Sequence, residues 1–127
     1  MITSLLKWLE TPPAGGVWWA TVLLTLLIEG ITAFFRFGMK LESTRHTGFV
    51  AYLTWDIRIH HGYVGLLLLM VSLLRPEPAM WRNLTVIVGG SLVASDFIHH
   101  FLVLWPITGS PHFDLVYPGW YERHPKG

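Results

Sequence analysis

Two pairs of adjacent histidines, each preceded by an aspartate, are the residues of this sequence best suited to chemistry. The pattern D-x3-HH contains Asp56, His60 and His61, and the pattern D-x2-HH contains Asp96, His99 and His100. The second pattern lies in SDFIHHFLVLWP, whose other residues suit the interior of a lipid bilayer. A charged side chain near the bilayer centre costs about 2.5–3.5 kcal/mol, so titratable residues there are candidates for a functional site.

Coordination of a divalent cation is the simplest way to offset this cost. When carboxylates and neutral imidazoles bind Zn, Fe or Cu, the metal–ligand bonds offset the free energy that these groups lose on leaving water. We therefore predict a transition-metal site, mononuclear or dinuclear, with ligands drawn from Asp56, His60, His61, Asp96, His99 and His100. Adjacent residues on a helix point about 100° apart, which favours one ligand from each pair, His60 and His100, with His99 next. Glu29 is predicted to bridge metals or to act as the catalytic base.

Other interpretations of these residues remain open. Haem b held between one histidine of each pair is one, and a hydrogen-bonded or proton-conducting network is another. Glu29 would also suit an ion pair with Arg36 or Arg58, which reduces the cost of burial. His46, His112 and His124 fall in predicted loops and are expected to be solvated, although His112 is the best placed of them to fold back as an additional ligand.

Three apolar stretches are expected to position the site as transmembrane helices, at residues 17–36, 48–74 and 81–105. Each approaches or exceeds the roughly 20 residues needed to cross a bilayer core about 30 Å thick. Pro106 is expected to end the third helix. Residues 106–127, rich in Pro, Gly and aromatic residues, are expected to form an irregular C-terminal cap. The predicted fold is thus all-α, with residues 1–127 forming a single membrane domain.

The order of these helices brings the titratable residues to one level. The first predicted helix ends, the second begins and the third ends on the same side of the membrane. Glu29 lies late in the first helix, His60 early in the second and His100 late in the third. Residues three or four apart share a helix face, so the polar residues of each helix are expected to form one stripe.

Composition supports the membrane assignment and excludes other classes. The chain is 52% hydrophobic and 13% charged, with a mean hydropathy of +0.46. Its formal charge of +1 leaves no basic stripe for nucleic acid, which is not an expected partner. The absence of cysteine excludes thiolate zinc sites and iron–sulfur clusters. The distribution of Lys and Arg places the loop at residues 37–47 and the C-terminus in the cytoplasm of a multi-pass protein.

The two Asp and His patterns also resemble motifs of known membrane enzymes. They are similar to the histidine boxes of membrane desaturases and hydroxylases, in which H-x-x-H-H repeats hold two irons, although Asp56 and Asp96 replace the leading histidine. An aspartate and a histidine four residues apart on adjacent helices also resemble the zinc site of membrane amide hydrolases of the ceramidase type. Both families are much larger than this chain, and each resemblance covers about ten residues in two places.

These features predict a small membrane metalloenzyme acting on an apolar or lipidic substrate. Zinc would imply hydrolysis, and iron or copper would imply oxidation. The alternatives are a haem b-binding membrane anchor for electron transfer and a transporter of metal ions or protons. Three helices make a thin wall around a site, so we expect a homo-oligomer or a small subunit of a larger membrane complex, with membrane lipids as further partners.

Overall fold

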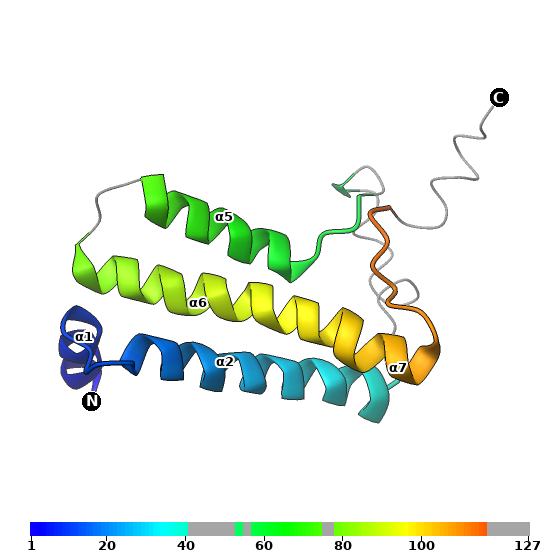
Figure 1. Cartoon of the computed structure of the whole chain (residues 1–127), viewed down its shortest axis with the longest axis horizontal. Helices are drawn as coiled ribbons and strands as arrows, with labels where there is room; N and C mark the ends of the chain where they lie inside the picture. Colours follow the sequence, from blue (N-terminus) through cyan, green and yellow to red (C-terminus); the bar gives the residue numbers. More distant parts are fainter. Residues whose placement is uncertain (41–52, 55–56, 75–77, 117–127) are drawn as a thin grey trace.

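The structure is a computed structural model that describes residues 1–40, 53–54, 57–74 and 78–116. Its helices are α1 (Ile2–Glu10), α2 (Gly16–Ala33), α5 (His61–Leu74), α6 (Ala79–Phe97) and α7 (Trp105–Thr108). Two π-helical stretches, η1 (Phe34–Gly38) and η2 (Ile98–Leu104), continue α2 and α6. Helix α6 lies between α2 and α5 and contacts both (Figure 1). The predicted all-helical class is confirmed.

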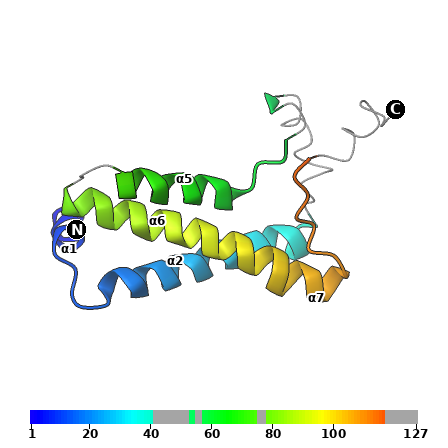
Figure 2. The same cartoon turned by 45° about the horizontal axis from the view of Figure 1, so that its top comes forward.

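The directions of the helices decide which of their ends lie together. Helices α2 and α6 run in the same direction, and α5 runs opposite to them (Figures 1 and 2). The C-terminal ends of α2 and α6 therefore lie at the same end of the bundle as the start of α5. Helix α1 crosses the other end, where it packs against α6.

Within the part of the chain that the structure describes, two helices, not the predicted three, are long and apolar enough to cross a membrane. They are Gly16–Gly38, with 23 residues, and Ala79–Thr108, with 30 residues. The prediction of a spanning helix at residues 48–74 is wrong, because α5 begins only at His61 and has 14 residues. At 1.5 Å per residue it is about 21 Å long, well short of a bilayer core of about 30 Å.

Residues 57–60, which directly precede α5, are not helical, and their backbone pairs with another segment. Ile57 forms an isolated β-bridge with Val116, and the Arg58 amide donates to the carbonyl of Leu115 at 2.9 Å. The Arg58 amide thus donates to the C-terminal segment and not to the carbonyl four residues earlier, as it would in a longer α5. Hydropathy alone does not reveal such pairing.

The helix that begins with α6 also continues past its predicted end at Trp105. Pro106 is the second residue of α7, which directly follows η2, and it does not end the helix as predicted. The helix instead stops at Gly109, which has φ +76° and caps it in the left-handed conformation. Residues 109–116 of the predicted cap lack regular helix, and residues 117–127 lie outside the described residues.

Small and polar side chains fill the helix interfaces, whereas most large apolar side chains point outward. Gly65 and Gly89 bring the backbones of α5 and α6 together, since a Cβ on Gly65 would lie 2.5 Å from the Gly89 carbonyl oxygen. Between α2 and α6, the Ser91 hydroxyl donates to the carbonyl of Thr21 at 3.0 Å. Of the large apolar side chains that the structure describes, three are buried: Leu9, Ile87 and Leu104. This pattern is typical of helices that pack within a membrane.

Candidate metal site

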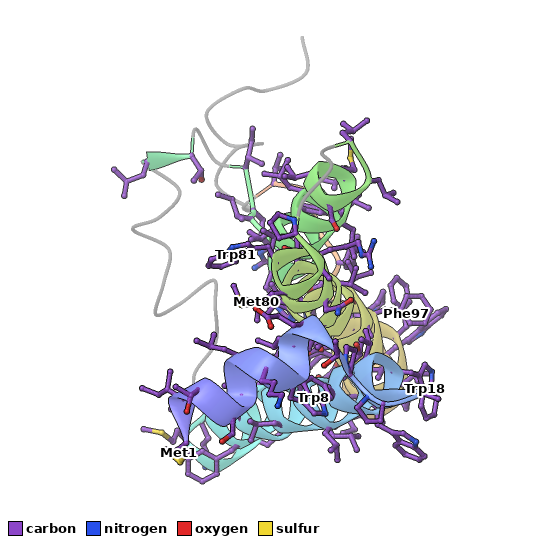
Figure 3. The ribbon with its side chains drawn as sticks, turned by 90° about the vertical axis from the view of Figure 1, so that its left-hand side faces the viewer. Met1, Trp8, Trp18, Met80, Trp81 and Phe97 are labelled. Carbon is purple, nitrogen blue, oxygen red and sulfur yellow. The ribbon has the colours of Figure 1, made fainter. Side chains whose placement is uncertain are left out.

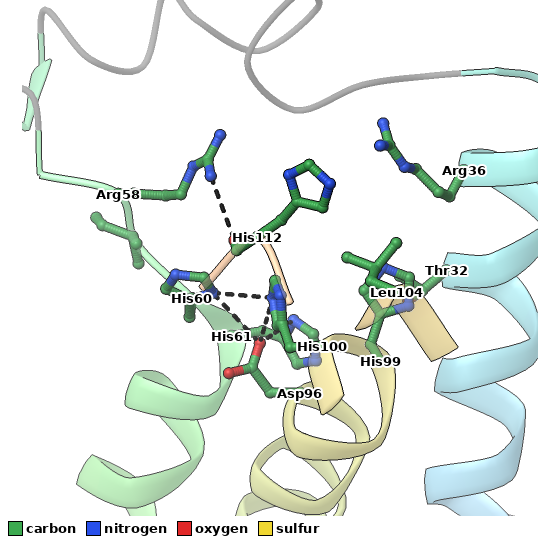
Figure 4. Close-up of a pocket in the computed structure, with 11 residues that line it drawn as sticks. Thr32, Arg36, Arg58, His60, His61, Asp96, His99, His100, Leu104 and His112 are labelled. Atoms are coloured by element: carbon green, nitrogen blue, oxygen red, sulfur yellow. Dashed lines mark hydrogen bonds and ion pairs between the residues drawn. The ribbon is translucent and has the colours of Figure 1, made fainter. Parts of the chain in front are cut away.

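His60, Asp96 and His100 form a buried cluster where α5 begins and α6 passes into η2 (Figure 4). The Nδ1 atom of His60 lies 3.1 Å from Nε2 of His100. The Oδ1 atom of Asp96 lies 3.7 Å from each of these two nitrogens. Asp96 and His100 are four residues apart and therefore share a helix face, and His60 reaches them from the segment just before α5.

The dimensions of this triangle suit a small divalent ion. Ligands at about 2.0–2.1 Å from a tetrahedral metal are separated from one another by about 3.3–3.4 Å. The three separations in the cluster, 3.1, 3.7 and 3.7 Å, bracket that distance. Two imidazoles and one carboxylate can thus reach one ion with small side-chain adjustments.

Backbone carbonyls fix which nitrogen of each histidine faces the cluster. The Nε2–H of His60 donates to the carbonyl of Asp114 at 3.2 Å. The Nδ1–H of His100 donates to the carbonyl of Pro111 at 2.7 Å. Because a carbonyl can only accept, each neutral ring keeps its lone pair on the nitrogen that faces the other histidine. Outer hydrogen bonds of this kind are typical of metal-ligating histidines.

The cluster consequently gathers three electron-pair donors around one point. The Oδ1 atom of Asp96 is buried and makes no hydrogen bond among the described residues. Burial lowers the pKa of His60, but the neighbouring Asp96 carboxylate and the hydrogen bond to the Asp114 carbonyl outweigh it, so the pKa is raised above the usual 6.5. The His60 ring therefore favours a positive charge in this setting, and a bound cation would satisfy the same demand.

An aromatic lid from the C-terminal segment covers the cluster. The ring of Phe113 stacks on His60, with centroids 4.4 Å apart and planes at 24°, and contacts the edge of His100 at 5.1 Å. The segment is held in place by Arg58, whose Nη1 lies 3.3 Å from Oδ2 of Asp114. Sequence reasoning missed Phe113 and the two carbonyls, because no side-chain pattern marks a backbone acceptor.

Of the other predicted site residues that the structure describes, His61 lies beside the cluster, whereas His99 and Glu29 lie apart from it. His61 touches its edge, with Nδ1 3.3 Å from Oδ1 of Asp96. His99 points to α2 instead, where its Nδ1–H donates to Oε1 of Glu29 at 3.0 Å. Glu29, predicted as a bridging ligand or base, thus contacts a histidine outside the cluster. Asp56 lies outside the described residues.

A cavity of about 450 Å³ opens beside the cluster. Figure 4 shows the arginine side chains of Arg36 and Arg58 and the ring of His112 above the three clustered residues. His112 was considered as an additional ligand, but it lines the cavity without joining the cluster. The full lining comprises Thr32, Arg36, Arg58, Ile59, His60, His61, Asp96, His99, His100, Leu104 and His112.

Comparison with known proteins gives no further guide to this site. No family model, curated protein or solved structure matches the chain.

Proposed function

We propose that this chain is a small membrane protein that binds one divalent transition metal through His60, Asp96 and His100. Support for the membrane location comes from the two helices of spanning length and from their surfaces. Leu23, Leu26 and Leu27 on α2 are each about 60% exposed, with values of 64%, 61% and 59%. Exposure of such large apolar side chains to water is unfavourable, whereas the lipid tails of a bilayer would cover them.

The observation that carries the metal proposal is the mutual orientation of His60 and His100. Each has its outer nitrogen on a backbone carbonyl, so two lone pairs face each other at 3.1 Å beside an ionisable carboxylate. Three acceptors that face one another need a proton or a metal ion between them, and a divalent ion can bind all three at once. Imidazole and carboxylate ligands suit zinc or iron better than magnesium or calcium.

The number of ligands supports an enzyme over a purely structural site. Structural zinc sites usually have four protein ligands, whereas catalytic sites have three and keep one position for water or substrate. Among the residues that the structure describes, three such side chains converge beside the cavity. Zinc bound in such a site lowers the pKa of its water to about 7 and so supplies a nucleophile for hydrolysis.

The cavity suits an amphiphilic substrate that carries an anionic group. Arg36 and Arg58 line it, and because a guanidinium group carries five N–H donors, Arg58 can pair with Asp114 and still donate to a carboxylate or phosphate. Exposed apolar helix surfaces reach the same end of the bundle, where Phe34 and Leu102 are 61% and 62% exposed. We therefore propose hydrolysis of a lipid-like ester or amide as the reaction class.

The spacing of the two histidines gives less support to haem b. Two axial nitrogens at about 2.0 Å on opposite sides of one iron would lie about 4 Å apart, with the porphyrin between them. In the cluster the nitrogens are 3.1 Å apart, and Asp96 occupies a third side. A single ion held on one side by three ligands agrees better with these positions.

Metal titration of the detergent-purified protein tests the binding proposal. Zinc binding to the metal-free wild type is compared with binding to His60→Ala, Asp96→Asn, His100→Ala and the control His112→Gln. His112 lines the same cavity but lies outside the cluster. We expect one zinc per wild-type or control chain and loss of binding in the other three variants. Equal binding by all five proteins would reject the site.

A substrate screen tests the proposed reaction class. The zinc-loaded protein is incubated in mixed micelles with fluorogenic lipid esters and amides, with and without a phosphate or carboxylate group. We expect turnover that a chelator abolishes and that added zinc restores, with preference for the anionic substrates. Zinc binding without chelator-sensitive turnover of any substrate would retain the metal site and reject the hydrolase.

A further inference from the structure

Helix α1 has sharply separated apolar and polar faces. At 100° per residue, Ile2, Leu5, Leu6 and Leu9 cluster on one side of Ile2–Glu10. The opposite side carries Thr3, Ser4, Lys7 and Glu10, all of which are exposed. With nine residues, α1 is far too short to cross a membrane.

The apolar face of α1 is turned toward the bundle but extends beyond it. Leu9 is 5% exposed, and its carbonyl accepts a hydrogen bond of 2.8 Å from Nδ2 of Asn83 on α6. Leu5 lies one turn earlier on the same face and is 57% exposed, and Ile2 is 72% exposed. The face that packs on the bundle at Leu9 thus continues uncovered toward the N-terminus among the described residues.

Tryptophans surround α1 at this end of the bundle. Trp18 lies near the start of α2 and Trp81 near the start of α6, and they are 59% and 52% exposed. Figure 3 shows α1 crossing the end of the bundle, with Trp8 on α1 and the other two rings near the starts of their helices. Exposed tryptophans at the ends of apolar helices typically mark the boundary between lipid and water.

We infer that α1 lies in the surface of the membrane, at the end of the bundle opposite the candidate metal site, with Leu5 and Ile2 inserted among the lipids. The inference rests on the proposed membrane location. The bundle side of α1 is then the lipid side, which agrees with the direction in which Leu9 points. The outward side presents Lys7 and Glu10 to water, as in interfacial amphipathic helices.

Single-cysteine spin labelling tests this placement, because the native chain contains no cysteine. Three variants are labelled with a nitroxide in phosphatidylcholine vesicles: Leu5→Cys on the apolar face, Lys7→Cys on the polar face and Leu27→Cys in the middle of α2. Collisions with oxygen, which concentrates in lipid, are compared with collisions with the water-soluble chelate chromium oxalate. The Lys7 variant is the matched control, since it lies on the same short helix and is also exposed.

The inference predicts that the label at Leu5 is accessible to oxygen and protected from chromium oxalate, whereas the label at Lys7 collides with chromium oxalate. The label at Leu27 should be protected in the same way as that at Leu5. Protection at Leu27 together with equal chromium oxalate collisions at Leu5 and Lys7 would overturn the placement of α1 and leave the membrane location standing. Free access of chromium oxalate at Leu27 would overturn both.

Discussion

Nδ1 of His60 lies 3.1 Å from Nε2 of His100, although the other nitrogen of each ring already donates to a backbone carbonyl oxygen. Both carbonyls, those of Pro111 and Asp114, belong to the C-terminal segment that folds over the cluster. This segment therefore orients two histidines from different elements toward one point. A proton or a metal ion must lie between these two nitrogens, because their lone pairs would otherwise repel each other.

Metal binding should weaken as the pH falls. A histidine binds metal only when neutral, and Asp96 and the Asp114 carbonyl raise the pKa of His60 above its usual value despite burial. Above that pKa the metal meets a neutral ring, and below it each unit of pH should reduce the apparent affinity about tenfold for each proton displaced. Zinc titrations between pH 8 and pH 5 measure this dependence. An affinity that stays constant over this range would contradict a site containing His60.

The contact between α5 and α6 should depend on the absence of a side chain at Gly65. A Cβ there would lie 2.5 Å from the backbone oxygen of Gly89, whereas a Cβ at Gly30 on α2 would meet nothing within 4 Å. Gly65→Ala should destabilise the protein by about 1–3 kcal/mol or more through overpacking. The control Gly30→Ala should be neutral or stabilising by up to about 1 kcal/mol. Unfolding of both variants in detergent checks the difference, and equal stabilities would contradict the helix packing.

Gly62 should control the position of the Asp96 carboxylate. A Cβ at Gly62 would lie 2.7 Å from Oδ2 and 2.9 Å from Cβ of Asp96. Gly62→Ala should therefore displace the Asp96 carboxylate. We expect zinc affinity to fall by about 10–100-fold, which is the usual effect of removing a residue that orients a metal ligand. Zinc titration against Gly30→Ala as control measures the effect. Unchanged affinity in a folded Gly62→Ala protein would show that Asp96 is not a ligand.

Glu29 and His99 should act as a stabilising pair that is separable from metal binding. Their buried hydrogen bond joins α2 to η2, so replacing either partner leaves a buried polar group unpaired, at a cost of about 1–3 kcal/mol. The double variant Glu29→Leu with His99→Leu should lose less stability than the sum of the single variants. Detergent unfolding and zinc titration of all three variants check this. Strictly additive losses would argue against the pair, and loss of zinc binding would place one of them in the metal site.

The sequence predicted the helical class and the end of the bundle at which the titratable residues gather, because helix order and residue spacing follow directly from hydropathy. The positions of Asp96 and His100, four residues apart in a long apolar run, already implied a shared helix face. The sequence did not predict that His60 lies outside a helix, because the backbone pairing of Arg58 with Leu115 joins segments that are distant in sequence. Without this pairing, the apolar run from Tyr63 to Leu74 predicts the end of a longer helix.

Choosing among the histidines also required the fold. Both His99 and His100 suited a metal site by type and spacing, and only the packing of α2 against η2 shows that His99 meets Glu29. The partners that orient His60 and His100 are backbone carbonyls, for which side-chain patterns give no signal. Phe113 covers the cluster from a segment that composition marked only as irregular.

X-ray absorption spectroscopy of the zinc-loaded protein is the sharpest test of the metal site, because it reports the ligands of the bound ion. We expect one zinc per chain with two imidazole nitrogens and additional oxygen ligands at about 2.0–2.2 Å. In His100→Ala the imidazole contribution should fall or zinc should be lost, whereas in His112→Gln the spectrum should not change. A zinc ion with oxygen ligands alone, or one whose imidazole signal survives in both variants, would contradict the assignment of His60, Asp96 and His100 as the metal site.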